Sequence, residues 1–153
     1  MHFLDITCIA LAAALAGSGT ARAETPVSVS APASATSTLS VTFIDIETKQ
    51  GSIMLALYDE AGWNGGKPVR AEMVDASTGQ AHVSISDLPA GRYGVKAFHD
   101  INGNGQMDTN PFGMPTEPFA FSNNARGQAG PAAWADAAFT VAPGSNTQRI
   151  VIR

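Results

Sequence analysis

Short stretches of alternating hydrophobic and polar residues run along the chain from residue 38 to residue 153. In the first stretch, Leu39, Val41 and Phe43 alternate with Ser40 and Thr42, which is the pattern of a β-strand with one buried face. Further stretches cover 51–60, 67–76, 80–88, 92–100, 137–144 and 147–153, with glycine or proline turns between them. About seven short strands predict an all-β sandwich.

The same alternation predicts which side chains face the core. The stretch 51–60 is apolar on both faces, which favours a central strand. In 67–76, Val69, Ala71 and Met73 alternate with charged residues and are expected on the buried face. The last two stretches are expected to pair with each other around a turn at 143–146. Residues 61–66 are expected to form a glycine-rich loop, and only 132–138 favours a helical turn.

The N-terminal region has the features of a targeting segment. Residues 6–16 form an apolar run, and Ala21-Arg22-Ala23 fits a small-x-small cleavage site, so we predict a signal peptide over residues 1–23. No Lys or Arg precedes the run, which leaves a core helix or a retained anchor as the alternative. Residues 24–37 are rich in Ser, Ala and Pro and are expected to form a disordered linker before a single domain at 38–153.

Composition narrows the compartment and the partners. Cys8 is the only cysteine, so cleavage after residue 23 would exclude disulfides and a cysteine nucleophile. From the predicted signal peptide, we expect a periplasmic or extracellular protein without a transmembrane span in its mature form. The formal net charge is −4. The sequence shows no cluster of basic residues, so nucleic acid is not expected as a partner.

Oxygen-bearing side chains gather just after the stretch 92–100. They occupy positions 1, 3, 5 and 9 of a calcium-loop pattern, with a glycine at position 6 and the backbone carbonyl of Gln106 at position 7. Calcium needs six to eight oxygen ligands, and side chains two apart in a curling loop converge on one centre. The side chains are those of Asp100, Asn102, Asn104 and Asp108.

The calcium pattern is incomplete, and a metal-free interpretation stands beside it. Position 12 is a proline where a bidentate Glu is expected, and a strand instead of a helix precedes the loop. Glu117 or Asp59 would have to supply the missing oxygens, giving a moderate or weak calcium site. Alternatively, Asp and Asn side chains bond their own backbone in Asx-turns and need no ion.

Other polar and aromatic residues near this loop have two interpretations each. His99 suggests a general base, but no serine or cysteine nucleophile motif accompanies it, so a hydrogen-bonded structural role is favoured. The aromatic residues, Trp63 and Trp134 included, either pack the loops onto the sheet or form a platform for a ligand, and packing is favoured. The candidate ligand surface comprises His99, Phe112, Phe119, Phe121, Ser122 and Asn123.

Three segments together resemble a bacterial family of small exported proteins of unknown function. They are L-P-x-G-x-Y at 88–93, H-D-x-N-x-N-x-x-x-D at 99–108, and G-x-P-x-E-x-F-x-F-S-N at 113–123. The resemblance implies a compact β-sandwich of immunoglobulin-like or transthyretin-like kind, and no known reaction. The family favours glycine where this chain has Pro118 or Ala120. The matching positions are His99, Asp100, Asn102, Asn104, Asp108, Gly113, Pro115, Glu117, Ser122 and Asn123.

Three functions are compatible with these residues. The favoured one is a non-enzymatic exported module whose loop, ordered by internal hydrogen bonds or calcium, presents a surface to an envelope protein or a glycan. The second is a hydrolase in which Asp100, Asp108 or Glu117 act as acid and base. The third is a structural or assembly protein of the cell envelope, held away from a surface by the linker.

Overall fold

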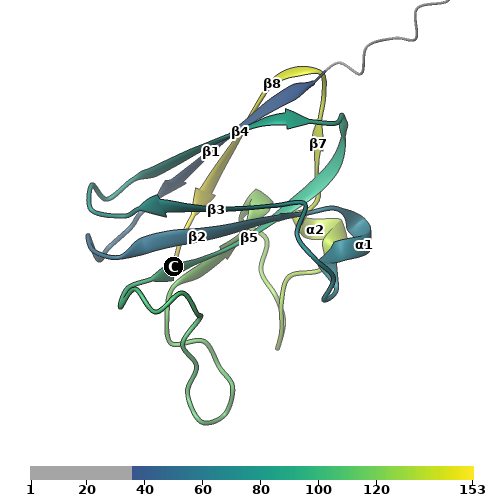
Figure 1. The fold of residues 1–153 in the computed structure, drawn as a ribbon. Coiled ribbons are helices and arrows are strands. Elements are labelled where there is room, and N and C mark those ends of the chain that lie inside the picture. Colours follow the sequence, from purple (N-terminus) through teal and green to yellow (C-terminus); the bar gives the residue numbers. More distant parts are fainter. Residues whose placement is uncertain (1–35) are drawn as a thin grey trace, which may run out of the picture. The chain divides into compact units, whose positions relative to one another are not determined.

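A computed structural model describes residues 36–153 of the chain, as two packed β-sheets (Figure 1). The predicted signal peptide and almost all of the predicted linker therefore lie outside the described residues. The strands are β1 (Ser37–Ile44), β2 (Ser52–Tyr58), β3 (Arg70–Asp75), β4 (Ala81–Leu88), β5 (Gly91–Asp100), β6 (Phe119–Phe121), β7 (Phe139–Val141) and β8 (Gly144–Val151). Three short helical segments complete the fold: α1 (Glu60–Trp63), the 3-10 turn η1 (Ser122–Asn124) and α2 (Trp134–Ala137).

The strand order confirms the predicted all-β sandwich. One sheet has the order β4-β1-β8, and the other has the order β3-β2-β5-β6 with β7 also paired to β5. All pairs are antiparallel except β1 with β8, which run parallel over their whole length. Over residues 36–153, no helix is long and apolar enough to cross a membrane.

Two details of the strand assignment differ from the prediction. The stretches that contain β7 and β8 do not pair with each other, because the turn between them carries the chain from one sheet to the other. Asn146 holds that turn by bonding both the N–H and the carbonyl of Ala142, at 2.9 and 2.7 Å. β6 was not predicted, since three residues between a proline and a tight turn are too few to show a period.

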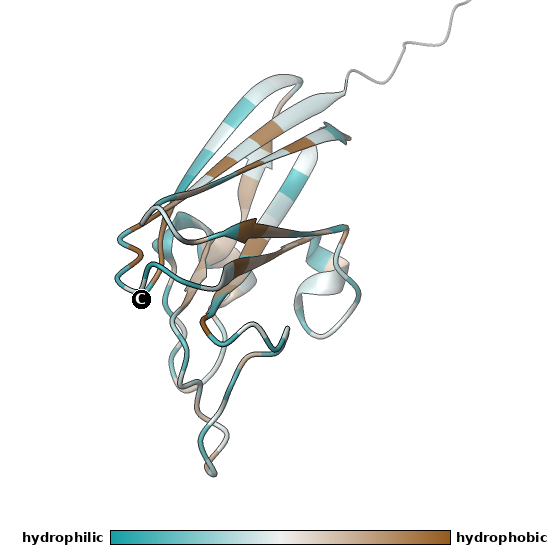
Figure 2. Ribbon diagram, turned by 60° about the vertical axis from the view of Figure 1, so that its left-hand side comes forward, coloured by the Kyte–Doolittle hydropathy of each residue, from teal (hydrophilic) through white to brown (hydrophobic). Residues whose placement is uncertain are grey.

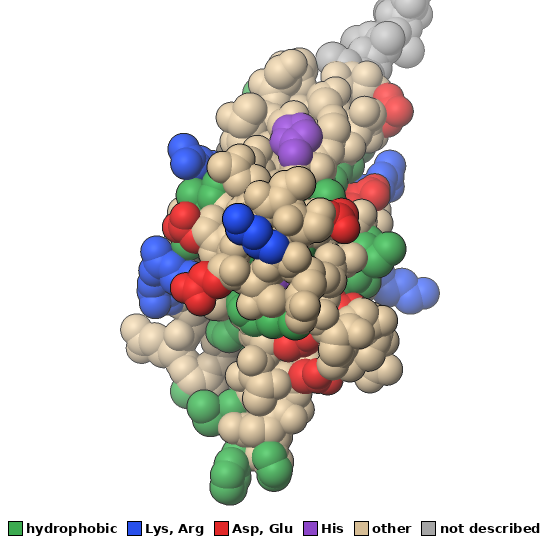
Figure 3. All heavy atoms as spheres, turned by 90° about the vertical axis from the view of Figure 1, so that its left-hand side faces the viewer, with side chains coloured by type: hydrophobic (Ala, Val, Ile, Leu, Met, Phe, Trp, Pro, Cys, Tyr) green, Lys and Arg blue, Asp and Glu red, His purple; other side chains and the backbone are tan. Residues whose placement is uncertain are grey.

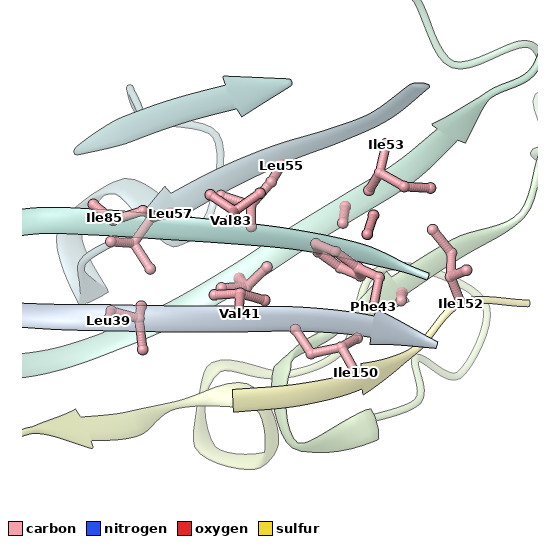
Figure 4. Packing of buried hydrophobic residues seen from close by; sticks show 14 of the residues in the cluster. Leu39, Val41, Phe43, Ile53, Leu55, Leu57, Val83, Ile85, Ile150 and Ile152 are labelled. Carbon is pink, nitrogen blue, oxygen red and sulfur yellow. The ribbon is translucent and has the colours of Figure 1, made fainter. Parts of the chain in front are cut away.

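The core lies between the two sheets, as the alternation predicts. Leu39, Val41 and Phe43 of β1 meet the inward residues of β2 (Figure 4). Figure 2 shows brown, hydrophobic segments interrupted by pale and teal ones along several strands, as expected where one face is buried. The largest fully buried hydrophobic side chains of this core are Phe43, Leu39, Ile53, Leu57, Leu88, Ile150, Val41, Val95 and Val141.

The facing of β3 is a correction to the prediction. Ala71 and Met73 are exposed, and Met73 retains 67% of its surface. Residues directly opposite in an antiparallel pair point to the same face, so Val74, opposite the buried Ile53, faces inward within β3. Val69, just before the strand, packs against the core as predicted. Met73 pairs with Met54 on the outer side. The register with β2 therefore determines which side chains of this edge strand point toward the core, and the alternation in its own sequence does not.

A second hydrophobic cluster, which is mainly aromatic, covers the outer face of β5. It joins Trp63, Phe121 and the partly buried Trp134, and the indole N–H of Trp63 donates to the carbonyl of Ala132 at 3.0 Å. Gly94 makes this packing feasible, because a Cβ there would lie 2.7 Å from the Trp63 ring. Both tryptophans therefore serve in packing, as the favoured interpretation expects.

Gly94→Ala should destabilise the fold by about 1–3 kcal/mol, because the added methyl overlaps the two indole rings. Urea unfolding followed by tryptophan fluorescence measures the loss. Gly130→Ala is the matched control, since nothing lies within 4 Å of the position that its methyl would take. Equal stabilities for the two variants would contradict the close contact at Gly94.

Candidate functional site

A long loop joins β5 to β6 and projects from one end of the sandwich, as the green loop at the bottom of Figure 1 shows. We call residues 100–118 the arm. It contains all of the residues that the sequence analysis proposed as metal ligands except Asp59, which precedes α1. Its conformation depends on three carboxylates, described in turn below.

Asp100 ends β5 and organises the first turn of the arm. The residue is 2% exposed. One carboxylate oxygen accepts from the N–H groups of Gly103 and Asn104 at 2.8 and 3.1 Å, and the other accepts from Gly105 at 2.8 Å. Gly103 and Gly105 have φ of 76° and 74°, the left-handed conformation that glycine adopts without strain. The turn therefore wraps its donors around one buried anion.

Asp108 receives the side chains of the two asparagines. The amide nitrogens of Asn102 and Asn104 donate to its carboxylate at 2.6 and 2.9 Å. The amide oxygens accept in turn from the backbone N–H groups of Asn104 and Gln106, at 3.0 and 2.7 Å. These are Asx-type bonds, so the hydrogen bonds of the metal-free interpretation are present.

Glu117 links the outgoing and returning segments of the arm by hydrogen bonds. One carboxylate oxygen accepts from the N–H of Ile101 at 2.9 Å, and the other accepts from the N–H of Asp108 at 3.1 Å. The side chain is only 7% exposed. Glu117 therefore belongs to the hydrogen-bonded arm, although it lies nine residues after Asp108, the last side chain of the calcium-loop pattern. Asp59 does not contribute, because its side chain caps α1 by accepting from the N–H of Gly62 at 2.8 Å.

The far end of the arm is a tight turn with an apolar tip. The side-chain oxygen of Asn110 accepts from the N–H groups of Phe112 and Met114, both at 3.0 Å. Thr109 and Pro115 form a bridge across the turn. Phe112 and Met114 are nevertheless 89% and 62% exposed. Figure 3 shows hydrophobic side chains at this projecting end of the molecule.

The remaining candidate residues are spread over different environments. His99 is buried, and its Nε2 lies 2.7 Å from the carbonyl of Gln50. Ser122 is also buried; its hydroxyl donates to Ala137 and accepts from Val95. Asn123 is exposed and donates to two carbonyls near α2. Phe121 packs in the aromatic cluster, so only Phe112, Phe119 and Asn123 of the predicted ligand surface are open to solvent.

The donor set for calcium is partly assembled. Asp108 and the two asparagine amides converge, but their amide oxygens are already used by backbone N–H groups. An ion would have to compete with those bonds. Within the described part of the chain, no group of three or more His, Cys, Asp or Glu side chains is arranged to hold a metal. Calcium binding stays a prediction.

A small β-sandwich with a self-bonded acidic arm is the class of protein that these features define. Residues 41–149 match the family described as "Uncharacterized protein conserved in bacteria (DUF2141)", and the chain belongs to that family. This confirms the resemblance noted in the sequence. Comparisons with curated proteins and with solved structures gave no match.

Sequence reasoning identified Phe112 as a ligand-surface candidate but missed Met114. The exposure of Met114 could have been predicted from the sequence N-P-F-G-M-P at 110–115, where turn-forming residues surround two large apolar side chains. A turn of this kind leaves no room to bury both.

Replacing Glu117 with Gln should cost about 1–3 kcal/mol of unfolding free energy, since the amide nitrogen would face one of two backbone N–H donors. Asp100→Asn should cost a similar amount for the same reason. Urea unfolding in excess chelator measures both. Glu72→Gln, at an exposed position of β3, is the control; a loss no greater than that of the control would refute the structural role.

The calcium prediction is tested on the same protein. A site in the arm should bind with a dissociation constant on the order of 10⁻⁵–10⁻³ M, the range of extracellular modules. Titration calorimetry should show this binding, millimolar calcium should raise the unfolding midpoint, and Asp108→Asn should abolish both effects. A melting curve that is identical in chelator and in millimolar calcium, without binding heat, would reject calcium as a ligand.

Proposed function

We propose that the protein is an exported, non-enzymatic binding module that inserts the tip of its arm into an apolar socket on a partner protein of the cell envelope. One observation carries this proposal. Phe112 and Met114 are among the most exposed large hydrophobic side chains of residues 36–153, and they lie at the end of a projection that hydrogen bonds hold in shape.

The rigidity of the arm favours binding. Association costs free energy when a loop must be ordered, and a loop already fixed in one conformation avoids much of that cost. The tip is fixed by Asn110 and by the bridge between Thr109 and Pro115. Pro111 and Pro115 restrict the backbone further. An apolar tip gains free energy only when it leaves water, so a socket is the complementary surface.

Charge favours a particular kind of partner. Residues 97–124 include three carboxylates and no Lys or Arg. A partner whose socket is bordered by basic residues would attract the arm and orient it. An anionic lipid surface would repel it, because membrane-binding segments use Lys and Arg. A protein partner is therefore favoured over a membrane.

The carboxylates of the arm support a binding role over hydrolysis. Asp100 and Glu117 are buried, and both oxygens of each accept backbone N–H bonds. A general base must be free to reach a substrate proton. Here the same oxygens hold the loop together, so using them in catalysis would loosen the arm.

Photo-crosslinking in cells can identify the partner. A benzoylphenylalanine placed at position 112 should capture one envelope protein, whereas the same residue at position 73 should not. Met73 is a fair control, because it is also a largely exposed hydrophobic residue, 67% against 89% for Phe112, and lies on β3. The captured protein is then purified for binding measurements with the full mature chain.

Phe112→Ser with Met114→Ser should weaken binding to that partner by about tenfold or more, as expected for truncation of anchor residues. Met73→Ser should leave the affinity unchanged, and rising salt should weaken binding if the socket has a basic border. Equal affinity of the tip variant and wild type would contradict the proposal. So would tip-dependent binding to lipid vesicles or tip-dependent self-association in place of capture.

A further inference from the structure

A cavity of about 320 Å³ lies beside β6, separate from the tip of the arm. Its volume is at the lower end of the range for small-molecule sites, roughly 300–1,000 Å³. It is formed where β6, the segment after η1 and the end of β8 meet. Nothing in the docking role proposed above uses it.

One wall of the cavity is apolar and aromatic. Phe119 and Phe121 stand on the same side of β6, and their rings meet edge to face with centroids 5.9 Å apart. Phe121 continues into the buried aromatic cluster, whereas Phe119 is partly exposed. Ala125 and Val151 extend this wall. Such a surface suits a flat or branched apolar group.

The charged residues of the lining all have one sign. Arg126 and Arg153 contribute to the cavity, and no Asp or Glu lines it. The cavity is therefore locally basic, although the chain has a formal net charge of −4. Arginine is the side chain best suited to hold a carboxylate, because its planar guanidinium can donate two parallel hydrogen bonds.

The backbone around the cavity is held by direct bonds. The N–H of Phe119 donates to the backbone oxygen of Arg153 at 2.8 Å, which joins β6 to the segment that follows β8 of the other sheet. The side chain of Asn124 accepts from the N–H of Val151 at 2.8 Å. The walls that carry Phe119 and Arg153 are therefore positioned before any ligand arrives, which reduces the cost of binding.

We infer that this cavity binds a small organic carboxylate with an aromatic or branched apolar body. The apolar part would lie against Phe119 and Phe121, and the carboxylate would face Arg126 and Arg153. The site would give the module a second ligand of a different class from the protein partner of the arm.

Three probes of one shape and different charge test the inference: naphthoate, neutral naphthamide and cationic naphthylmethylamine. Amide NMR spectra of the isotope-labelled mature chain should shift at Phe119, Ala125 and Val151 with naphthoate. Naphthoate should bind at least about fivefold more tightly than naphthamide, since the carboxylate gains charge-assisted hydrogen bonds. The cationic probe should bind most weakly.

Variants locate the charge effect. Arg126→Gln with Arg153→Gln should remove the preference for naphthoate over naphthamide. Arg149→Gln, a control on the outer face of the other sheet, should keep it, as should the Phe112→Ser and Met114→Ser tip variant. Equal binding of the anion and the amide to wild type would overturn the inference. A preference that survives the double arginine variant, or shifts confined to other residues, would overturn it as well.

Discussion

The capture of backbone N–H groups by buried carboxylates is the interaction on which the conformation of the arm depends. A loop of this length carries many polar backbone groups, and those that leave water need partners. Asp100 supplies three bonds to the first turn, and Glu117 supplies two more that join the outgoing and returning chains. A charged acceptor makes each bond stronger than a neutral one would, so a few side chains fix the whole segment.

This arrangement explains how a small domain can carry a long projection. The arm has no hydrophobic core of its own, and its largest apolar residues, Phe112 and Met114, face solvent. Its order comes from polar bonds near the sheet and from turn residues at the far end. The sandwich supplies a firm base, because Gly51 packs directly against the carbonyl of Asp100. Binding surfaces on loops that a rigid scaffold positions are common in β-proteins.

The sequence was most informative for features that depend on residues close to one another along the chain. Alternation located the strands and most of the core, and the Asx pattern identified the residues of the first turn. It was misleading for β3, because its facing follows from the pairing of Val74 with Ile53. It could not locate the cavity, because Arg126 and Arg153 are far apart along the chain and line one cavity only in the folded protein, where Phe119 bonds to Arg153.

The parallel pairing of β1 with β8 has a consequence for the order of folding. β1 lies between β4 and β8, so the first strand of the sandwich has both neighbours only when the last strand is available. Contacts between such distant segments make closure slow. Until β8 has been made, the backbone groups along one edge of β1 therefore lack their partners. The three-stranded sheet is therefore completed only by the last strand of the chain, although its central strand is the first to be made.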